Sequence, residues 1–300
     1  MGDYAEAYKA FDNATKINPR DTQAWTNKGL ALGHLGRYGE TVYAFDMAIK
    51  INPENSEAWT NRGTALFYQK KYSEAIKSYD KALKIDQNSS IAWNNKGIAL
   101  NMNGKDERTL MDSLSAFNNA IKAGQPSAEI WYNKGVILGK LGKHLEAIEA
   151  YNNALNLNPY DAQIWENRGN ALGKLDRLEE ALESFDKAIQ LNPRKASVWY
   201  NKGIALGILN RYSEAIDGFN KAIELNPQYA SAWLMLGNAL ISKNESEKAL
   251  EAYNKAIQIN STYALAWYNK GIMLSKLGRS KEAQTAYKKA HEINSTFNIP

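Results

Sequence analysis

The chain has 300 residues, 44% of them hydrophobic, with 37 Lys and Arg against 32 Asp and Glu, so its net charge of +5 is mild. The basic residues are dispersed and no apolar run reaches the roughly 18 residues of a membrane span, which argues against a nucleic-acid-binding or membrane protein. There is no cysteine, which excludes disulfides and thiolate metal sites, and residues 1–19 do not resemble a signal peptide, so we expect a reducing, cytoplasmic location.

A unit of 34 residues recurs along the chain. Residues 1–19 align with residues 35–53, the second half of the first complete unit. Eight complete units follow, and they begin near Thr22, Ser56, Ser90, Ala128, Ala162, Ala196, Ala230 and Ala264. Each contains one tryptophan followed four residues later by glycine, and the tryptophans stand at residues 25, 59, 93, 131, 165, 199, 233 and 267. Such a period indicates an array of stacked units, so residues 1–300 are predicted to form one domain.

One unit is longer than the others. The stretch between Gly104 and Phe117 carries four more residues than its counterparts, so two tryptophans are 38 residues apart. Four residues make about one helical turn, so the second helix of this unit is predicted to begin a turn earlier and to keep Phe117 and Ala120 in the core. A functional protrusion is the alternative.

The order of the recurring residues resembles the tetratricopeptide repeat (TPR), a pair of antiparallel helices. The unit that begins at Ala196 shows it with Trp199, Gly203, Tyr212, Phe219 and Pro227. The resemblance implies an all-α protein, a right-handed α-solenoid or superhelix of helix-turn-helix repeats that binds other proteins. It does not imply an enzyme.

The first helix of each unit carries a row of asparagines. We number its positions from the tryptophan; positions −2, +2, +5 and +9 lie opposite the apolar side, and the resemblance implies that they line a concave groove. We call this side the ladder face. Seven of the eight units have asparagine at +2, namely Asn27, Asn61, Asn95, Asn133, Asn167, Asn201 and Asn269. Asparagine is a poor helix former, so we expect another reason for the row.

Two interpretations of this row are open. The row resembles the asparagine ladder in the TPR superhelix of the O-linked N-acetylglucosamine transferase family, which implies that these amides hold the backbone of an extended or disordered protein segment. An amide matches a peptide group, because it offers an acceptor and two donors. Alternatively, each asparagine bonds to the neighbouring repeat and fixes the pitch of the array.

Other side chains are predicted near the ladder. Tyr132, Tyr200 and Tyr268 at position +1 flank it and offer an apolar surface to a ligand. The unit of Trp233 replaces its polar residues, so Leu234, Met235 and Ile241 are predicted to form an apolar patch for a ligand side chain or another copy of the chain. Ordinary sequence drift is the alternative.

Position +3 is basic in seven units, with Lys28, Arg62, Lys96, Lys134, Arg168, Lys202 and Lys270. The usual TPR has an apolar residue here, and a charge at this position must reach water or an acid. Asp46, Asp80 and Asp186, which follow the second-helix aromatic, are the predicted ion-pair partners; an anion site is the alternative.

The sequence lacks a recognisable catalytic or metal site. Its three histidines, at residues 34, 144 and 291, stand at different repeat positions, and no glycine-rich phosphate loop is present. We therefore expect no enzyme activity, no metal and no cofactor. The predicted function is a protein-interaction scaffold that binds an extended polypeptide. The alternatives are a substrate-recruiting arm of a larger enzyme and a self-assembling scaffold, a homo-oligomer joined through uncapped ends.

Overall fold

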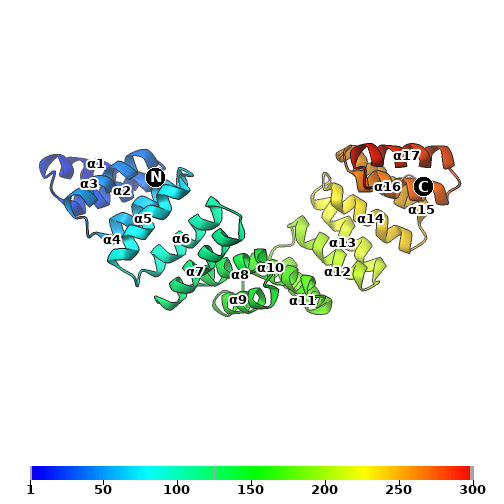
Figure 1. Cartoon of the computed structure of the whole chain (residues 1–300), viewed down its shortest axis with the longest axis horizontal. Helices are drawn as coiled ribbons and strands as arrows, with labels where there is room; N and C mark the ends of the chain where they lie inside the picture. The colour runs from blue at the N-terminus through cyan, green and yellow to red at the C-terminus, as the bar shows by residue number, and fades with distance from the viewer. Residues whose placement is uncertain (1, 125, 298–300) are drawn as a thin grey trace. The chain divides into compact units, whose positions relative to one another are not determined.

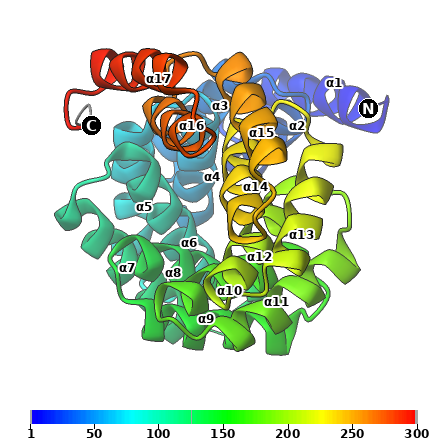
Figure 2. The ribbon, with the colours of Figure 1, turned by 90° about the vertical axis from the view of Figure 1, so that its right-hand side faces the viewer.

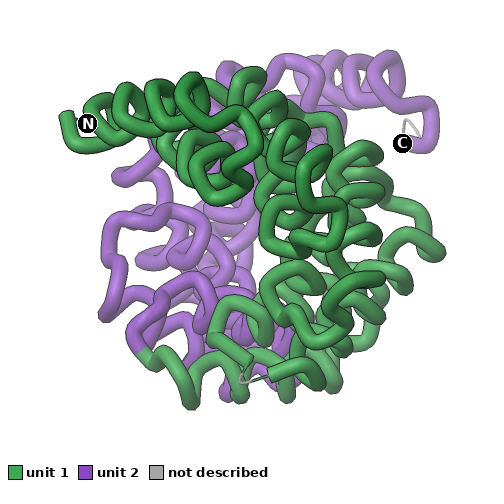
Figure 3. Tube along the Cα trace, turned by 90° about the vertical axis from the view of Figure 1, so that its left-hand side faces the viewer, with its two compact units in different colours: residues 1–159 green, residues 160–300 purple. Residues whose placement is uncertain are grey.

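The predicted helix pairs are present throughout the computed structural model, which describes residues 2–124 and 126–297. Within these ranges the chain forms seventeen α-helices and no strand, which confirms the all-α solenoid of paired helices. The chain divides into two compact units, residues 1–159 (unit 1) and 160–300 (unit 2), shown in different colours in Figure 3. Whether the two units act as the single predicted domain stays a prediction.

Unit 1 contains α1 (Gly2–Ile17), α2 (Thr22–His34), α3 (Tyr38–Ile51), α4 (Ser56–Tyr68), α5 (Tyr72–Ile85), α6 (Ser90–Asn103), α7 (Glu107–Lys122), α8 (Ala128–Lys140) and α9 (His144–Leu157). Unit 2 contains α10 (Ala162–Lys174), α11 (Leu178–Leu191), α12 (Ala196–Ile208), α13 (Tyr212–Leu225), α14 (Ala230–Ser242), α15 (Ser246–Ile259), α16 (Ala264–Lys276) and α17 (Ser280–Ile293). The helices are labelled in Figure 1.

Within each unit the helices pack in sequence order. The even-numbered helices are the first helices of the repeats. Each packs on the second helix of its own repeat and, where that helix lies in the same unit, on the second helix of the repeat before it, as α14 does on α15 and α13. Figure 2 shows these three helices of unit 2 from another side. In unit 1, α1 takes the place of a second helix and packs on α2. The first helices of successive repeats therefore lie next to one another and share one face.

The repeat core depends on the glycine four residues after each tryptophan. A Cβ atom at Gly203 would lie 2.7 Å from the Phe219 ring, and one at Gly63 would lie 2.6 Å from the Tyr79 ring. Both rings are 1% exposed, so neither can move aside into water. Glycine therefore lets the two helices of a repeat approach over a buried aromatic ring, the kind of group whose removal from a core costs about 3–5 kcal/mol.

The start of the first helix is fixed by local hydrogen bonds. In α2 the Asp21 side chain accepts a hydrogen bond from the Ala24 backbone N–H at 2.9 Å, and Asn55 caps α4 in the same way. The Trp59 indole Nε1–H donates to the Pro53 carbonyl oxygen at 2.9 Å, and so ties the helix to the loop before it. Short polar residues thus cap α2, α4, α6, α8 and α10, whereas α12, α14 and α16 begin without a side-chain cap.

The long unit behaves as its sequence predicts. Helix α7 has 16 residues, where the equivalent α3 and α5 have 14. It begins ten residues before Phe117, whereas α3 begins seven before Phe45, so the extra residues add about one turn at its start. Phe117 and Ala120 remain fully buried, which confirms that the insertion does not rotate the helix out of register.

Candidate functional site

Three clefts open on the ladder face in the same repeat register. Cleft 1 lies between α2 and α4 (about 370 Å³), cleft 2 between α10 and α12 (about 490 Å³) and cleft 3 between α12 and α14 (about 240 Å³). Each is lined by positions +4, +5, +8 and +9 of one first helix and by +2, +5, +6 and +9 of the next. The first residue and the aromatic residue of the intervening second helix complete the lining. Clefts of this size can each receive a side chain.

The asparagine row connects neighbouring repeats at several points. Asn201 Nδ2 donates to Asn170 Oδ1 at 2.9 Å, and Asn269 Nδ2 donates to Asn238 Oδ1 at 3.0 Å. Asn95 Nδ2 lies 3.4 Å from Thr64 Oγ1. In all three pairs, position +2 of one repeat contacts position +5 of the repeat before it. Each bond uses one amide N–H, which leaves a second N–H and the carbonyl oxygen for another partner.

The remaining asparagines are held differently. Asn133 Nδ2 lies 3.5 Å from Asn94 Oδ1, a +1 residue of the preceding repeat. Asn27 and Asn167 bond to residues four positions earlier in their own helices, Gln23 and Gln163. Asn61 lines cleft 1, and its side chain makes no hydrogen bond within the described ranges.

The +5 residue of the preceding repeat is apolar for Asn61, as it is for Asn133 and Asn167, but those two asparagines bond elsewhere. The +5 residue before Asn61 is Leu30, which offers no polar atom to bond. Both residues line cleft 1. The row is therefore partly braced by the neighbouring repeat and partly unbraced.

The tyrosines predicted to flank the ladder pack within the helical array. The Tyr200 ring lies 4.8 Å from the Tyr229 ring and 6.0 Å from the Phe219 ring, measured between centroids. Burial raises the pKa of Tyr200 to about 12. Tyr132 packs on Tyr151 in the same manner. Tyr268 packs on Tyr287 and Phe297. These tyrosines are half-buried, so a ligand would meet only part of each ring.

The predicted apolar patch at Trp233 needs one correction. Leu234 is 2% exposed and lies in the core, not on the ladder face. The reason is its position, since the +1 residues Thr26, Thr60 and Glu166 are buried as well. Met235 lines cleft 3, and Ile241 is half-buried at position +8 of α14. Where Met235 replaces asparagine, the preceding +5 residue is Ile204, which lines the same cleft, so an apolar pair takes the place of a hydrogen-bonded one.

The basic row forms the ion pairs predicted for it. Arg62 Nε lies 2.6 Å from Asp46 Oδ1. Lys96 pairs with Asp80 at 2.7 Å, and Lys202 pairs with Asp186 at 2.5 Å. These basic side chains also lie over the tryptophan of their own repeat, as Arg62 does over Trp59 at 5.8 Å. The basic row therefore ties the first helix to the preceding second helix.

Lys134 and Lys270 have asparagine, Asn118 and Asn254, where the acid would stand. No ion pair of either lysine is present among the described residues. Burial lowers the pKa of both, and their Nζ atoms lie 5.2 Å and 5.1 Å from the tryptophan rings of their repeats.

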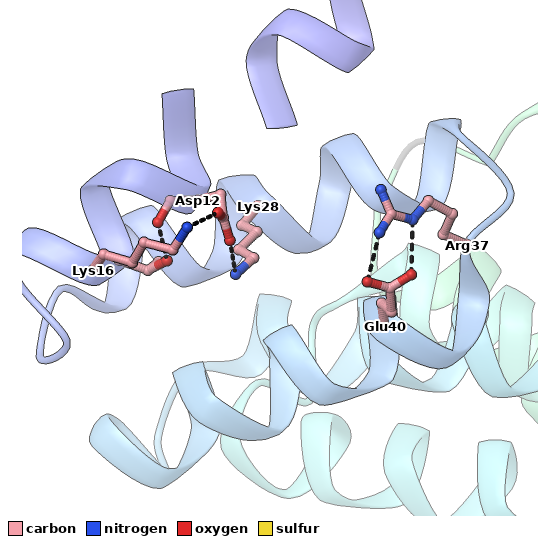
Figure 4. A network of polar contacts seen from close by, with 6 residues as sticks. Asp12, Lys16, Lys28, Arg37 and Glu40 are labelled. Atoms are coloured by element: carbon pink, nitrogen blue, oxygen red, sulfur yellow. Dashed lines mark hydrogen bonds and ion pairs between the residues drawn. The ribbon is translucent and has the colours of Figure 1, made fainter. Parts of the chain in front are cut away.

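A small polar network stands at the start of the array, shown in Figure 4. Asp12 accepts from Lys16 and Lys28, each at 2.7 Å. Hydrogen bonds from Lys16 and then from Lys28 lower the pKa of Asp12. Arg37 and Glu40 form a bidentate pair, 2.6 Å between Nη2 and Oε2. None of these five residues is among those that line cleft 1.

Sequence reasoning missed several cleft-lining residues. Gly33, Gly173 and Gly207 at position +8 line clefts 1, 2 and 3, and Tyr38 and Tyr212 form a wall of clefts 1 and 3. A signal was available, because glycine in a helix interior is unfavourable and needs a reason. The glycine at +8 occurs in only half of the units, so the invariant glycine at +4 obscured it.

The described residues form neither a metal site nor a membrane span. No group of three or more His, Asp or Glu side chains in these ranges is arranged to hold a metal ion. None of the helices described combines the length and the apolarity that crossing a bilayer requires.

Comparison with protein families identifies the repeat. A model described as "Tetratricopeptide repeat" matches residues 56–89, 128–161, 162–195, 196–229 and 264–297, which is more than half of the chain. Related repeat models match residues 1–56, 78–110, 219–251 and 237–278. No curated protein matches the sequence significantly.

The fold is similar to that of several solved structures. The crystal structure of MamA is 30% identical over 54% of this chain and 95% of its own, with a TM-score of 0.52. YrrB, described as a TPR protein with an unusual peptide-binding site, is 26% identical over 67% of this chain and 98% of its own, with a TM-score of 0.58. A repeat protein from Cytophaga hutchinsonii, at 19% identity and a TM-score of 0.66, covers 78% of this chain and 95% of its own, and shows the fold alone.

Proposed function

The chain belongs to the tetratricopeptide repeat family, and from this premise we propose that it is a non-catalytic protein-interaction scaffold that binds an extended polypeptide along its ladder face. The observation that carries the proposal is the recurrence of clefts in one register, each bordered by position +2 of the ladder. A recurring cleft suits a ligand whose own groups recur, as those of an extended chain do. The peptide-binding site described for YrrB supports the same role.

The amides of the ladder would hold the backbone of this ligand. Asn201 is fixed by one hydrogen bond and keeps an N–H and a carbonyl oxygen for a ligand. Asn61 has its whole amide available within the described contacts. The net contribution of each hydrogen bond is about 0.5–1.5 kcal/mol, so several asparagines of the ladder must bind the ligand together for useful affinity.

A comparison of Asn61→Ala with Asn201→Ala tests the proposal. Asn61→Ala removes no hydrogen bond of the free protein, so its melting temperature should stay the same or rise slightly. Asn201→Ala removes the bond to Asn170 and should lower stability by about 1 kcal/mol. Binding to a library of random extended peptides, measured by fluorescence anisotropy, should weaken for both variants.

The control is Asn13→Ala, on the exposed surface of α1 and outside the ladder. It should bind the library as the unmutated chain does. Unchanged library binding by Asn61→Ala would contradict the role of the ladder, and failure of the unmutated chain to bind any peptide would contradict the proposed function.

The predictions about location, kind of partner and self-association are part of this proposal. A cytoplasmic location, an extended or disordered partner and self-association stay predictions from the sequence. The absence of catalytic activity is also a prediction, and family membership supports it in general terms.

A further inference from the structure

The glycines at position +8 are not required by helix packing. A Cβ atom at Gly173 or Gly207 would meet no atom within 4 Å, and one at Gly33 would make an ordinary contact with Thr41 at 3.7 Å. The glycines at +4 differ, because a Cβ atom there would lie within 3 Å of a buried ring. Glycine is among the poorest helix formers, so its presence at +8 lowers helix stability without improving the packing.

The fold accepts large side chains at this position. The repeats without glycine at +8 carry Phe67, Asn101, Ile241 or Ser275 there, all in regular helices. Three of the four glycines at this position, Gly33, Gly173 and Gly207, each line a cleft on the ladder face. Their physical effect is to keep space open in these clefts.

Clefts 2 and 3 of unit 2 are adjacent and mostly apolar. They share Ile204 and Ile208, which form the wall between them. Leu178 and Phe185 complete cleft 2, and Tyr212 and Met235 complete cleft 3. Two side chains of one ligand could therefore enter on either side of α12.

The spacing of the two clefts sets the spacing of these side chains. Adjacent packed helices are about 8–10 Å apart. A polyproline II segment advances about 3.1 Å per residue and returns to the same face every third residue, about 9.3 Å along. Apolar residues at positions i and i+3 of such a segment match the two clefts.

A charged residue beside cleft 2 indicates a further feature of the ligand, besides its two apolar side chains. Lys174, at the end of α10, lines cleft 2 and is the single charged residue among those that line clefts 2 and 3. It is exposed and forms no ion pair with any residue of the described ranges. An acidic residue of the ligand would complement it on the α10 side.

Building on the proposed function, we propose that clefts 2 and 3 bind a partner segment with two apolar side chains three residues apart, preceded by an acidic residue that pairs with Lys174. Gly173 and Gly207 keep the clefts open for these side chains. Unit 2 thereby recognises side chains of the ligand, whereas the ladder binds the ligand backbone.

Labelled synthetic peptides and the full chain test this inference. The probe is a Ser/Gly peptide with an aspartate followed by two leucines three residues apart; its relatives have the leucines one, two or five residues apart, or a lysine in place of the aspartate. We expect the i, i+3 peptide to bind at least about tenfold tighter in fluorescence anisotropy than the other spacings. The lysine peptide should bind more weakly, and added salt should reduce its difference from the aspartate peptide.

Cleft-filling variants give the structural test. Gly207→Ile introduces the residue that the next repeat carries at position 241, and Gly173→Ile does the same in cleft 2. Each should keep its helix content and weaken the i, i+3 peptide about tenfold or more. Gly207→Ala is a smaller change that favours the helix and should give a smaller loss. Ser275→Ile places the same side chain at the exposed +8 position of α16, outside both clefts, and should leave binding unchanged.

The outcomes separate the two proposals. Equal affinity for all leucine spacings, or unchanged affinity in folded Gly207→Ile and Gly207→Ala, would overturn the inference and leave the scaffold function standing. If none of the peptides binds the unmutated chain, and the random library does not either, both proposals fail.

Discussion

Two alanine substitutions one helical turn apart in α12 should have opposite effects on stability. Gly203 and Gly207 stand at positions +4 and +8 of the same helix. In the structure a Cβ atom at residue 203 would lie 2.7 Å from Phe219 Cε1 and 2.9 Å from Cδ1, whereas one at residue 207 would meet open space. The same chemical change therefore meets a ring in one case and nothing in the other.

The magnitudes follow from these distances. Gly207→Ala should stabilise the protein by about 0.4–1 kcal/mol, because alanine restricts the unfolded chain and favours the helix. Gly203→Ala gains the same preference but must displace Phe219, which is 1% exposed and enclosed by the core. Overpacking costs about 1–3 kcal/mol. The net effect should be a loss of about 1–2 kcal/mol, so the two variants should differ by about 2–3 kcal/mol.

Urea unfolding followed by far-ultraviolet circular dichroism measures this difference. Gly207→Ala should shift the midpoint of the transition to higher urea and Gly203→Ala to lower urea, with the same slope for both variants. Equal stability of the two variants would refute the division of the glycines into a packing class and an open class. A stabilising Gly203→Ala would show that the Phe219 ring has room to move.

Three further predictions concern stability. Lys70 has a positive φ of 61° after α4, so Lys70→Gly should raise the free energy of unfolding by about 1 kcal/mol in urea titrations. Lys195 pairs with the buried Glu166 at 2.5 Å, so Lys195→Met should lower the melting temperature. The double variant Glu166→Tyr, Lys195→Tyr introduces the aromatic pair that the next repeat has at these positions, and should restore the melting temperature. Hydrogen bonds from its two lysine partners lower the pKa of Asp12 from the ordinary 3.8. The stability that these interactions contribute is therefore present above pH 3.8 and should be lost as the pH falls below that value. Asp12→Asn should not show this loss.

Much of the fold was predictable because the repeat fixes local structure. The first helices begin at the residues from which the units were counted, and capping residues such as Asp21 and Asn55 explain why. The partners Asp46, Asp80 and Asp186 were predictable because a basic residue inside an apolar arc needs an acid within reach. The register of Phe117 followed from the length of a helical turn.

The contacts between repeats were not predictable in the same way. A helical wheel describes one helix, and it does not show that position +1 faces the neighbouring repeat, which is why Leu234 was wrongly placed on the ladder face. The bond from Asn201 to Asn170 joins residues 31 apart in different helices. The sequence shows that both are asparagines without showing that they meet. The clefts depend on the same inter-helix geometry, so their lining at position +8 was also missed.

The exceptions in the asparagine row help to separate its two roles. A residue that braces repeats should depend on the partner it meets, and the row follows this rule where Met235 shares cleft 3 with Ile204 while Asn201 bonds to Asn170. Bracing gives no account of Asn61, since the preceding +5 residue is Leu30, an apolar side chain in the same cleft. A half-exposed amide beside leucine gains nothing from the helix or from the neighbouring repeat. Asn61 is therefore the position of the row at which the proposed ligand-binding role can be tested most cleanly apart from bracing.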